Sequence, residues 1–353
     1  MKPQLPKVIS HYFIDKTITS IAPYGEGHIH ETYLIETKDH QPDYILQKIN
    51  SNIFHNIPGI MENIDTVTNH LRKKLQQIPG HDPDRETLTL VRTKAGNLWF
   101  EDENGHCWRV YVFIPGTVTY QKIPGPTIAY ESGLVTGRFL SLLSDLQMPL
   151  KITIPAFHDI EFRIHQYLEA KTNDPAQRTG IAADAISFAE KRFERMKDYY
   201  AALKARAVLR ATHNDTKLNN ILFDENGKGL CLIDLDTVMP GYVHFDYGDA
   251  LRTMANTSLE DEKDVASVQF DRAVYESFTA GFLHATEGLL THDEIKLLPF
   301  APIYMTYIIG LRFLTDFLNG DKYFRVQNDL HNLVRAMVQF RLVNEMEGIL
   351  CLD

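Results

Sequence analysis

The sequence predicts an α+β fold of two lobes, with a small β-rich lobe over residues 1–114 and a larger, mainly helical lobe over residues 115–353. Short apolar segments separated by turns with glycine or proline fill the first part, as expected for strands. After Pro115-Gly116 the apolar residues recur at helical spacing, which predicts helices. With 353 residues and 44% hydrophobic content, the chain is long enough to bury a large core.

A glycine-containing turn is expected early in the N-terminal lobe. Residues 8–21 predict a short helix that leads into the first strand, and a turn with Gly25 and Gly27 precedes alternating strand residues up to Glu36. Paired glycines let a backbone approach phosphates closely, so Gly25 and Gly27 are candidate nucleotide-binding residues. An ordinary hairpin turn is at least as common for Gly-x-Gly, and both interpretations stay open.

The third strand is expected at residues 44–50, and a lysine on this strand could contact the phosphates of a nucleotide. Gln47 and Lys48 point to opposite sides of such a strand, so only one of them can face a nucleotide. Lys48 is the candidate for a contact with the α- and β-phosphates of ATP. A solvated edge lysine is the alternative.

A single long helix of this lobe is predicted over residues 60–75 by apolar residues at helical spacing. Glu62 or Asp65 on this helix is either the partner of the strand lysine or merely solvated. Pro79 and Gly80 end the pattern. Three more strands are then expected, at residues 88–91, 98–100 and 108–114.

The strand at residues 108–114 suits a hinge between the lobes, because it is apolar on both faces and stops at Pro115-Gly116. Its backbone would hydrogen-bond the adenine of ATP. Tyr111 and Phe113 are therefore candidate nucleotide contacts.

Helices are expected to form the scaffold of the second lobe, at residues 127–146, 157–168 and 182–203. A later apolar run extends from Leu297 to Leu314 but contains Pro299, Pro302 and Arg312. It falls short of an uninterrupted membrane span and is expected to be a buried helix.

The stretch from His213 to Asn220 reads H-x-D-x-K-x-x-N. An apolar strand, a Glu225-Asn226-Gly227 turn and a second apolar strand ending at Asp234 follow it. This is the catalytic-loop pattern of protein-kinase-like phosphotransferases. The hairpin favours that interpretation over a chance match, because it brings a second carboxylate to the loop.

Phosphoryl transfer depends on positioning and on neutralising charge, which explains the residue types in this pattern. Asp215 would accept the proton of the attacking hydroxyl or orient it, and Lys217 would point a compact positive charge at the transferring phosphate. Asn220 and Asp234 would supply oxygen ligands to Mg²⁺. His213 is expected to hold the loop backbone.

Other acidic residues near the motif leave alternatives open. Asp236 could be a water-mediated metal ligand, although a turn-stabilising aspartate is the commoner role. Asp246 or Asp249 would cap the next helix or clamp the catalytic-loop backbone from below.

Two other functional classes fit parts of the motif. A metal-dependent hydrolase could use His213, Asp215 and Asp234, but it would want more histidines at metal-ligand spacing. An inert nucleotide-binding pseudokinase is disfavoured because Asp215, Lys217, Asn220 and Asp234 are all present.

The composition limits the kinds of partner that the protein is expected to bind and the cellular compartment in which it is expected. A net charge of −10 argues against a nucleic-acid partner, which normally meets a basic face. The sequence shows no signal pattern, and its three cysteines are unclustered, so a cytoplasmic location without a membrane anchor is expected. The Pro240-Gly241 segment is too short for an activation loop. No protein partner is therefore implied, and the phosphate acceptor should be small.

Together these stretches resemble the aminoglycoside phosphotransferase and choline kinase superfamily, and within it the N-acetylhexosamine 1-kinases. The catalytic loop is shared by the whole superfamily, whereas His28 and the block at residues 310–324 are more particular. The shared stretches cover nearly the whole chain in order, at residues 24–29, 44–47, 212–222, 233–241, 245–249, 259–264, 294–300 and 310–324.

The resemblance implies a bilobal protein-kinase-like fold with ATP- and Mg²⁺-dependent phosphorylation of the anomeric hydroxyl of N-acetylglucosamine or N-acetylgalactosamine. Residues matching His28, Asp215, Arg312 and Tyr323 contact the sugar in that family, which carries no clear lysine at the position of Lys48. From the residues alone, Arg312 is a charge in an apolar helix that should face a cavity or pair with a carboxylate. Homoserine, choline or an aminoglycoside is the alternative acceptor, and the preferred hexosamine epimer stays open.

Overall fold

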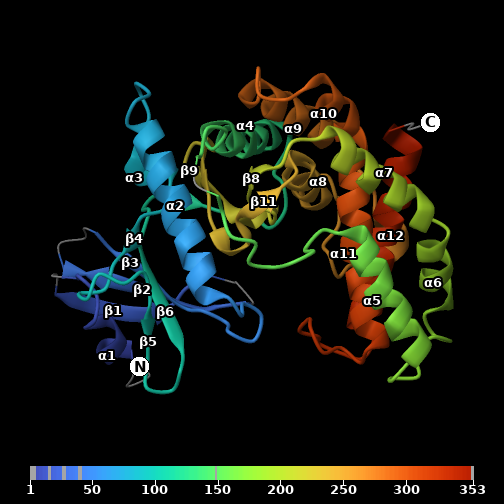
Figure 1. Ribbon diagram of the computed structural model, residues 1–353, viewed down its shortest axis with the longest axis horizontal. Helices are drawn as coiled ribbons and strands as arrows, with labels where there is room; N and C mark the ends of the chain where they lie inside the picture. The colour runs from blue at the N-terminus through green and yellow to red at the C-terminus, as the bar shows by residue number, and fades with distance from the viewer. Residues whose placement is uncertain (1–4, 15–16, 26–28, 39–41, 148, 351–353) are drawn as a thin grey trace.

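The computed structural model describes residues 5–14, 17–25, 29–38, 42–147 and 149–350, and it has the α+β architecture that the sequence predicts (Figure 1). The predicted Gly27 and His28 lie outside these residues. A β-sheet forms the N-terminal end of the molecule, and helices make up most of the remainder.

The N-terminal sheet is antiparallel, with the strand order β1-β2-β3-β6-β4 and with β5 paired to β6. The register sets Leu46 opposite Val110 on the face that packs on helix α1 (Leu5–Ile9). Ile45 and Tyr111 share the opposite face. The strands are β1 (Ile18–Pro23), β2 (Glu31–Thr37), β3 (Tyr44–Lys48), β4 (Leu90–Val91), β5 (Phe100–Glu101) and β6 (Cys107–Val112).

Helix α2 (Ile57–Leu75) joins the sheet to the rest of the protein. Its buried residues belong to the same core cluster as Tyr111 and as the helices of the second lobe. The Asn63 amide nitrogen donates to the carbonyls of Lys151 and Val238, both at 2.8 Å, and its oxygen accepts from the Lys151 backbone at 2.9 Å. Because both the nitrogen and the oxygen of the Asn63 amide are hydrogen-bonded, this buried side chain attaches α2 to the second lobe.

The connection between the lobes runs through residues 113–116. Strand β6 ends at Val112, and β7 (Thr117–Val118) already pairs with β9 (Ile221–Asp224) of the second lobe. The chain therefore passes from the N-terminal sheet to the β7–β9 pairing of the second lobe within residues 113–116, next to residue 114.

The second lobe is a helical body around a small antiparallel ribbon of β8 (Arg210–Thr212) and β11 (Met239–Gly241) and a hairpin of β9 and β10 (Gly229–Leu232). Two of its helices, α4 and α9, approach closely, because a Cβ on Gly133 would lie 2.1 Å from the Phe278 carbonyl oxygen. The helices after the short α3 (Pro83–Glu86) are α4 (Pro126–Leu142), α5 (Ile160–Asn173), α6 (Ala183–Glu190), α7 (Phe193–Arg206), α8 (Val243–Met254), α9 (Arg272–Ala285), α10 (His292–Leu297), α11 (Ala301–Leu318) and α12 (His331–Leu350).

Several predicted boundaries differ from the structure. The helix expected over residues 8–21 is the short α1, and the helix expected over residues 182–203 breaks into α6 and α7. At the break, the Arg192 guanidinium donates to Glu347 of α12 at 2.7 Å and stacks on Phe188. This tertiary contact holds the turn and has no signal in the local pattern.

Helix α11 is the buried apolar helix that the sequence predicts. The segment His292–Leu318 is long and apolar enough to cross a membrane, but 72% of its most apolar window is buried inside the protein. Pro302 lies in the first turn of α11, where a proline costs no helical hydrogen bond. The apolar surface of this helix is therefore used for the core.

Candidate active site

The catalytic loop leaves β8 at Thr212 through a left-handed residue, Asn214, with φ of 65°. Asparagine adopts this region more readily than most residues. Its amide nitrogen donates to the carbonyls of Thr237 at 3.0 Å and Thr212 at 3.2 Å. A Cβ on Gly241 would lie 2.3 Å from the Thr212 hydroxyl, so the β8–β11 ribbon needs glycine there. The ribbon and the Asn214 side chain together set the shape of the loop.

Asp246 clamps this loop from below, which confirms one of the two roles considered for it. Its carboxylate accepts the backbone N–H groups of His213 at 2.9 Å and Asn214 at 2.6 Å. Burial raises the pKa of Asp246 to about 6. The backbone bonds oppose that rise, because they favour the ionised carboxylate.

His213 holds the loop from the other side, as expected. Its Nε2 lies 2.9 Å from the Ile233 carbonyl oxygen, so this nitrogen carries the proton, and Nδ1 accepts the Asp215 N–H at 3.2 Å. The imidazole thus ties the loop to the strand end that precedes Asp234. With both nitrogens engaged, His213 is not available as a metal ligand in this arrangement.

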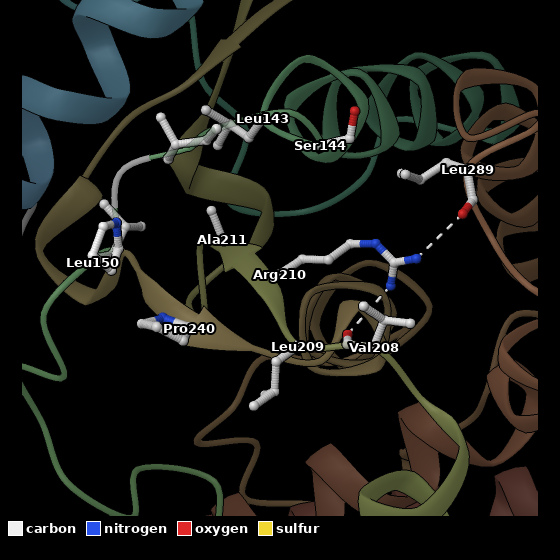
Figure 2. Close-up of a pocket in the computed structure, with 11 residues that line it drawn as sticks. Leu143, Ser144, Leu150, Val208, Leu209, Arg210, Ala211, Pro240 and Leu289 are labelled. Atoms are coloured by element: carbon white, nitrogen blue, oxygen red, sulfur yellow. Dashed lines mark hydrogen bonds between the residues drawn. The ribbon is translucent and has the colours of Figure 1, made fainter.

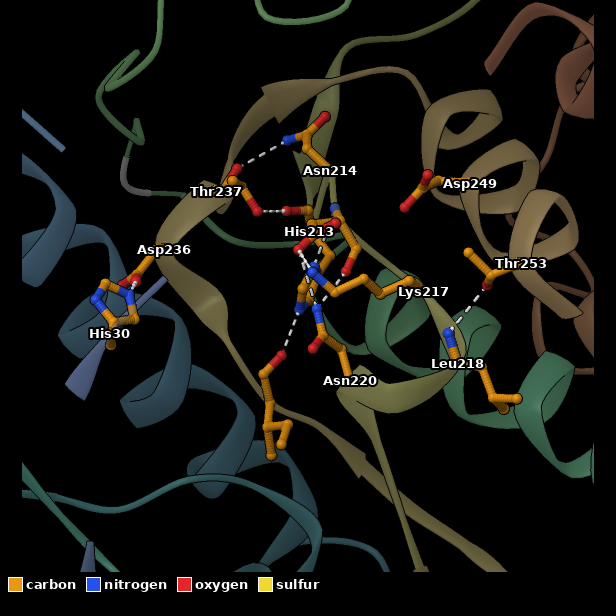
Figure 3. A network of polar contacts seen from close by, with 12 residues as sticks. His30, His213, Asn214, Lys217, Leu218, Asn220, Asp236, Thr237, Asp249 and Thr253 are labelled. Atoms are coloured by element: carbon orange, nitrogen blue, oxygen red, sulfur yellow. Dashed lines mark hydrogen bonds and ion pairs between the residues drawn. The ribbon is translucent and has the colours of Figure 1, made fainter. Parts of the chain in front are cut away.

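Asp215, Lys217 and Asn220 form one hydrogen-bonded cluster, part of which is labelled in Figure 3. Asp215 Oδ2 accepts from Lys217 Nζ at 2.9 Å and from Asn220 Nδ2 at 3.1 Å. Burial raises the pKa of Asp215, but the charge and hydrogen bond of Lys217, together with His213 and Arg252, outweigh it and hold the pKa below its usual value. Asp215 is therefore ionised, and one of its oxygens is held in place by its neighbours.

Asp234 lies beside this cluster in the left-handed region, with φ of 62°, directly after β10. The Ile233 N–H donates to the Asn220 carbonyl at 2.8 Å, which keeps the two predicted metal residues together. Among the described residues, the Asp234 carboxylate has no hydrogen bond or ion pair. Burial first, and then the negative charge of Asp236, raise its pKa. An uncompensated carboxylate beside an amide oxygen suits a hard cation such as Mg²⁺.

Asp236 is instead bound to the N-terminal sheet. Arg109 of β6, only 1% exposed, forms a bidentate ion pair with it and also donates from Nε to Gln47 Oε1 at 3.0 Å. His30 lies 2.5 Å from the same carboxylate (Figure 3). Burial opposes ionisation of Asp236, but Arg109 and His30 together outweigh it and hold the pKa of Asp236 far below the usual range. Arg109 was not among the predicted site residues, although a charge inside the apolar segment 108–114 is a sequence signal for a buried ion pair.

The ligand atoms of His30, Asp234 and Asp236 lie within 4.8 Å of one another, as a metal site would require. His30 Nδ1, however, accepts the Asn50 N–H at 3.1 Å, so Nε2 carries the proton that it donates to Asp236. Asp236 is neutralised by Arg109 as well. Asp234 with Asn220 is therefore the better ligand pair.

The candidate nucleotide residues fall into two groups. Tyr111 shares the sheet face of Gln47 and Arg109, and the Arg109 guanidinium lies 5.2 Å from its ring centroid. Phe113 makes an edge-to-face contact with Tyr24, next to Gly25, with ring centroids 5.7 Å apart. This contact brings the end of the predicted hinge to the start of the glycine turn.

The structure does not bring Lys48 to this site. Lys48 shares the face of Leu46, opposite Gln47, and its ammonium lies 3.4 Å from Glu31. The proposed partners on α2 pair elsewhere, because Glu62 contacts Lys151 and Asp65 contacts Arg92. The strand register is the physical reason, since a side chain one position along a strand points to the other face. Arg109 of the neighbouring strand supplies the buried cation on the side of the acidic residues.

Arg312 lies among three aromatic rings rather than against a carboxylate. Its guanidinium carbon lies 5.3 Å from the Phe157 ring centroid, 5.6 Å from that of Tyr323 and 5.5 Å from that of Phe324. One nitrogen lies 3.5 Å from the Tyr323 hydroxyl. In the described part of the chain Arg312 forms no salt bridge, so the alternative of an acidic neighbour is not supported. The two predicted acceptor residues are in contact with each other.

A pocket of about 410 Å³ behind the β8–β11 ribbon offers much less chemistry (Figure 2). Its walls are mainly Leu, Val, Ala and Pro, and its charged residue, Arg210, is paired with Glu294 and donates to the Leu289 and Val208 carbonyls. It is therefore not the candidate active site.

Comparisons with known proteins agree with the family pattern and with the fold. A family described as "Phosphotransferase enzyme family" matches residues 20–287. A choline kinase from Cryptosporidium parvum is similar in structure with a TM-score of 0.61 and 12% identity over 94% of this chain and 90% of its own. A Plasmodium vivax ethanolamine kinase has a TM-score of 0.56 and 13% identity over 93% and 84%. A spectinomycin phosphotransferase solved with ADP and spectinomycin has a TM-score of 0.54 and 13% identity over 98% and 97%. At these identities the likeness shows the fold.

The ion pair between Arg109 and Asp236 yields a stability prediction. Arg109→Met should lower the free energy of unfolding by about 3–5 kcal/mol, because Asp236 would remain as a buried charge without its main partner. The double variant Arg109→Met/Asp236→Asn should lose about 1–3 kcal/mol less than the sum of the two single changes. Urea unfolding followed by circular dichroism measures all three variants.

Arg272→Met is the matched control, because the exposed Arg272–Glu276 pair on α9 should contribute no more than about 1 kcal/mol. Strictly additive losses in the double variant would show that Arg109 and Asp236 are not coupled.

Proposed function

Because the chain belongs to the phosphotransferase enzyme family, we propose that it transfers the γ-phosphoryl group of ATP to the anomeric hydroxyl of an N-acetylhexosamine, giving the sugar 1-phosphate. The observation that carries the proposal is the cluster of Asp215, Lys217 and Asn220 beside the unpaired carboxylate of Asp234. This set supplies the positioned charges that phosphoryl transfer needs.

Asp215 is the proposed catalytic residue for the acceptor hydroxyl. Lys217 and Asn220 hold its Oδ2, which leaves Oδ1 to accept a hydrogen bond from the hydroxyl. A carboxylate with a lowered pKa is a weak base. In a loose transition state the nucleophile needs little activation, so Asp215 chiefly orients the hydroxyl and takes its proton late.

Lys217 is proposed to contact the transferring phosphoryl group. Burial would lower the pKa of Lys217, but Asp215 and Asp234 raise it above its usual value, so the ammonium stays charged. Asp234 and Asn220 would hold Mg²⁺, which when bound neutralises charge on the nucleotide phosphates. The protein's own part is to place these oxygen ligands at the end of β10 and beside the loop.

The nucleotide is proposed to lie between the sheet of residues 1–114 and the helical lobe of residues 115–353. Gly25, Tyr111 and Phe113 would line its site, together with Gly27 outside the described residues. The solved spectinomycin phosphotransferase contains ADP, which supports ATP as the donor here. We also propose that the enzyme acts in the cytoplasm, in keeping with its unclustered cysteines.

The acceptor is proposed to be N-acetylglucosamine or N-acetylgalactosamine, held by Arg312 and Tyr323 and by His28, which lies outside the described residues. The contact between Arg312 and Tyr323 supports this assignment, since a caged guanidinium without a carboxylate can donate to ring hydroxyls or to an acyl oxygen. Choline, ethanolamine and spectinomycin are named for the structural neighbours, so another small acceptor is the alternative.

Asp215→Asn should lower turnover by about 10²–10⁴-fold while ATP binding is kept, because the amide lacks the negative charge that orients the hydroxyl and cannot take its proton. Steady-state kinetics and calorimetric ATP titration measure the two effects. Asp184→Asn on exposed α6 is the matched control and should leave both unchanged. Turnover within a few-fold of wild type would remove Asp215 from the mechanism, and no turnover in wild type with any acceptor would favour a pseudokinase.

Asp234→Ala should abolish activity and remove the gain in nucleotide affinity that Mg²⁺ brings, because a carboxylate ligand of the ion is lost. Titrating ATP with and without Mg²⁺ measures this gain independently of turnover. Asp236→Ala is the comparison variant and should keep most of the gain, although it destabilises the protein by leaving Arg109 unpaired. The reverse ranking of the two variants would make Asp236 the ligand.

The 1-O-methyl glycoside of N-acetylglucosamine tests the position of transfer. A 1-kinase cannot phosphorylate it, because the anomeric hydroxyl is blocked, whereas the free sugar should give an acid-labile 1-phosphate. Mass spectrometry and phosphorus NMR of the products check this expectation. Phosphate on the methyl glycoside would refute anomeric transfer and leave the phosphotransferase assignment intact.

A further inference from the structure

A second arginine lies beside Arg312 and was not singled out from the sequence. Arg163 of α5 donates to the Phe157 carbonyl oxygen from Nε at 3.2 Å and from Nη2 at 2.8 Å, and from Nη1 to Gln166 Oε1 at 2.7 Å. Arg312 of α11 covers the ring of the same Phe157. The two guanidinium groups therefore flank one residue from two neighbouring helices.

The partners of these two arginines are neutral. Arg163 is bound to a carbonyl and an amide oxygen, and Arg312 to a tyrosine hydroxyl and aromatic rings. Within the part of the chain that the structure describes, neither forms an ion pair with a carboxylate. Burial first, and then the charge of Arg312, lower the pKa of Arg163 to about 9. Asp159 acts on Arg163 only through space, and no carboxylate among the described residues contacts either guanidinium, so the two cations repel each other and an oxygen-bearing ligand would relieve that repulsion.

The pair lies next to the catalytic loop through His158, the residue after Phe157. His158 Nε2 lies 3.0 Å from the Asn214 carbonyl oxygen, directly before Asp215. Burial first, with smaller contributions from both arginines and against the hydrogen bond to Asn214, lowers the pKa of His158 to about 3, so the imidazole is neutral and does not screen them. Phe157 and His158 therefore connect the two arginines to the residue that directly precedes Asp215.

We infer that Arg163, together with Arg312, determines the charge class of the acceptor: the site takes acceptors with neutral acyl or anionic oxygen groups and rejects acceptors with an ammonium group. The inference rests on the proposed phosphotransfer at Asp215 and adds Arg163 as a specificity-determining residue. It also separates this enzyme from choline and ethanolamine kinases, whose named substrates are cations.

The physical reason is simple electrostatics. An ammonium group near two guanidinium groups in a partly buried site meets like-charge repulsion, which water screens poorly there. A carbonyl or carboxylate oxygen accepts hydrogen bonds from the same groups. The acylamino group of an N-acetylhexosamine and the ammonium group of the free hexosamine differ in this respect while the sugar ring stays the same.

The experiment compares kcat/KM for N-acetylglucosamine and for glucosamine at a pH where the free amine is protonated. Wild type should prefer the acetylated sugar by about a hundredfold or more. Arg163→Met should reduce that preference by about tenfold, since one of two repelling charges is gone. Arg163→Lys loses the same forked hydrogen bonds but keeps the charge, so it should keep the preference within about threefold.

The comparison of Met with Lys separates charge from packing, because both variants lose the forked pair of hydrogen bonds to the Phe157 carbonyl. Thermal midpoints confirm that both are folded, and Arg272→Met is the control for removing a remote exposed charge. Equal changes in Arg163→Met and Arg163→Lys, or a wild type that uses glucosamine as well as its acetylated form, would overturn the inference.

A different set of results is expected if the proposed function is wrong. If wild type phosphorylates no hexosamine, the same variants are compared on choline and on glucuronate as a cation and an anion. A preference for glucuronate that Arg163→Met weakens and Arg163→Lys keeps would uphold the inference without the sugar assignment. A preference for choline would overturn the inference.

Discussion

The buried ion pair between Arg109 and Asp236 is the contact on which the arrangement of the active site depends. Arg109 belongs to the central strand β6 of the N-terminal sheet, and Asp236 follows Asp234 by two residues in the helical lobe. Moving either charge out of water is costly, and the geometry compensates only when every partner is present. Gln47 and His30 complete the set. A relative shift of the lobes would leave two buried charges unpaired, which fixes the sheet over the strand end that carries Asp234.

The Arg109–Asp236 pair also gives the nearby carboxylates of Asp234 and Asp236 different electrostatic environments. Asp236 is neutralised by Arg109, whereas Asp234 has no such partner within the described part of the chain and is held with a raised pKa. Asp215 is ionised by its contact with Lys217. Negative charge therefore gathers where a cation and the nucleotide phosphates would bind, whereas Arg163 and Arg312, which form no ion pair among the described residues, meet at Phe157. The separation matches a reaction in which phosphate and acceptor approach Asp215 from different sides.

The catalytic loop itself could be predicted because the residues that determine its chemistry and its local geometry are close together in the sequence. Asp215, Lys217 and Asn220 lie within six positions, and a loop closed by the β9–β10 hairpin brings them together whatever surrounds it. The clamp by Asp246 was one of two predicted roles, and the backbone contacts of His213 were expected. Helix boundaries were less accurate, as at Arg192, where a contact with α12 ends one helix and starts another.

The sequence by itself thus determined the two-lobed α+β fold, the catalytic loop and the burial of α11, because periodicity and short-range spacing carry that information. Tertiary structure alone decided which cation faces the acidic residues: the strand register turns Lys48 away and Arg109 inward. It also decided that Arg163 of α5 and Arg312 of α11, far apart in the chain, meet at Phe157. Such choices depend on which faces of separate elements pack together, and no local pattern specifies that.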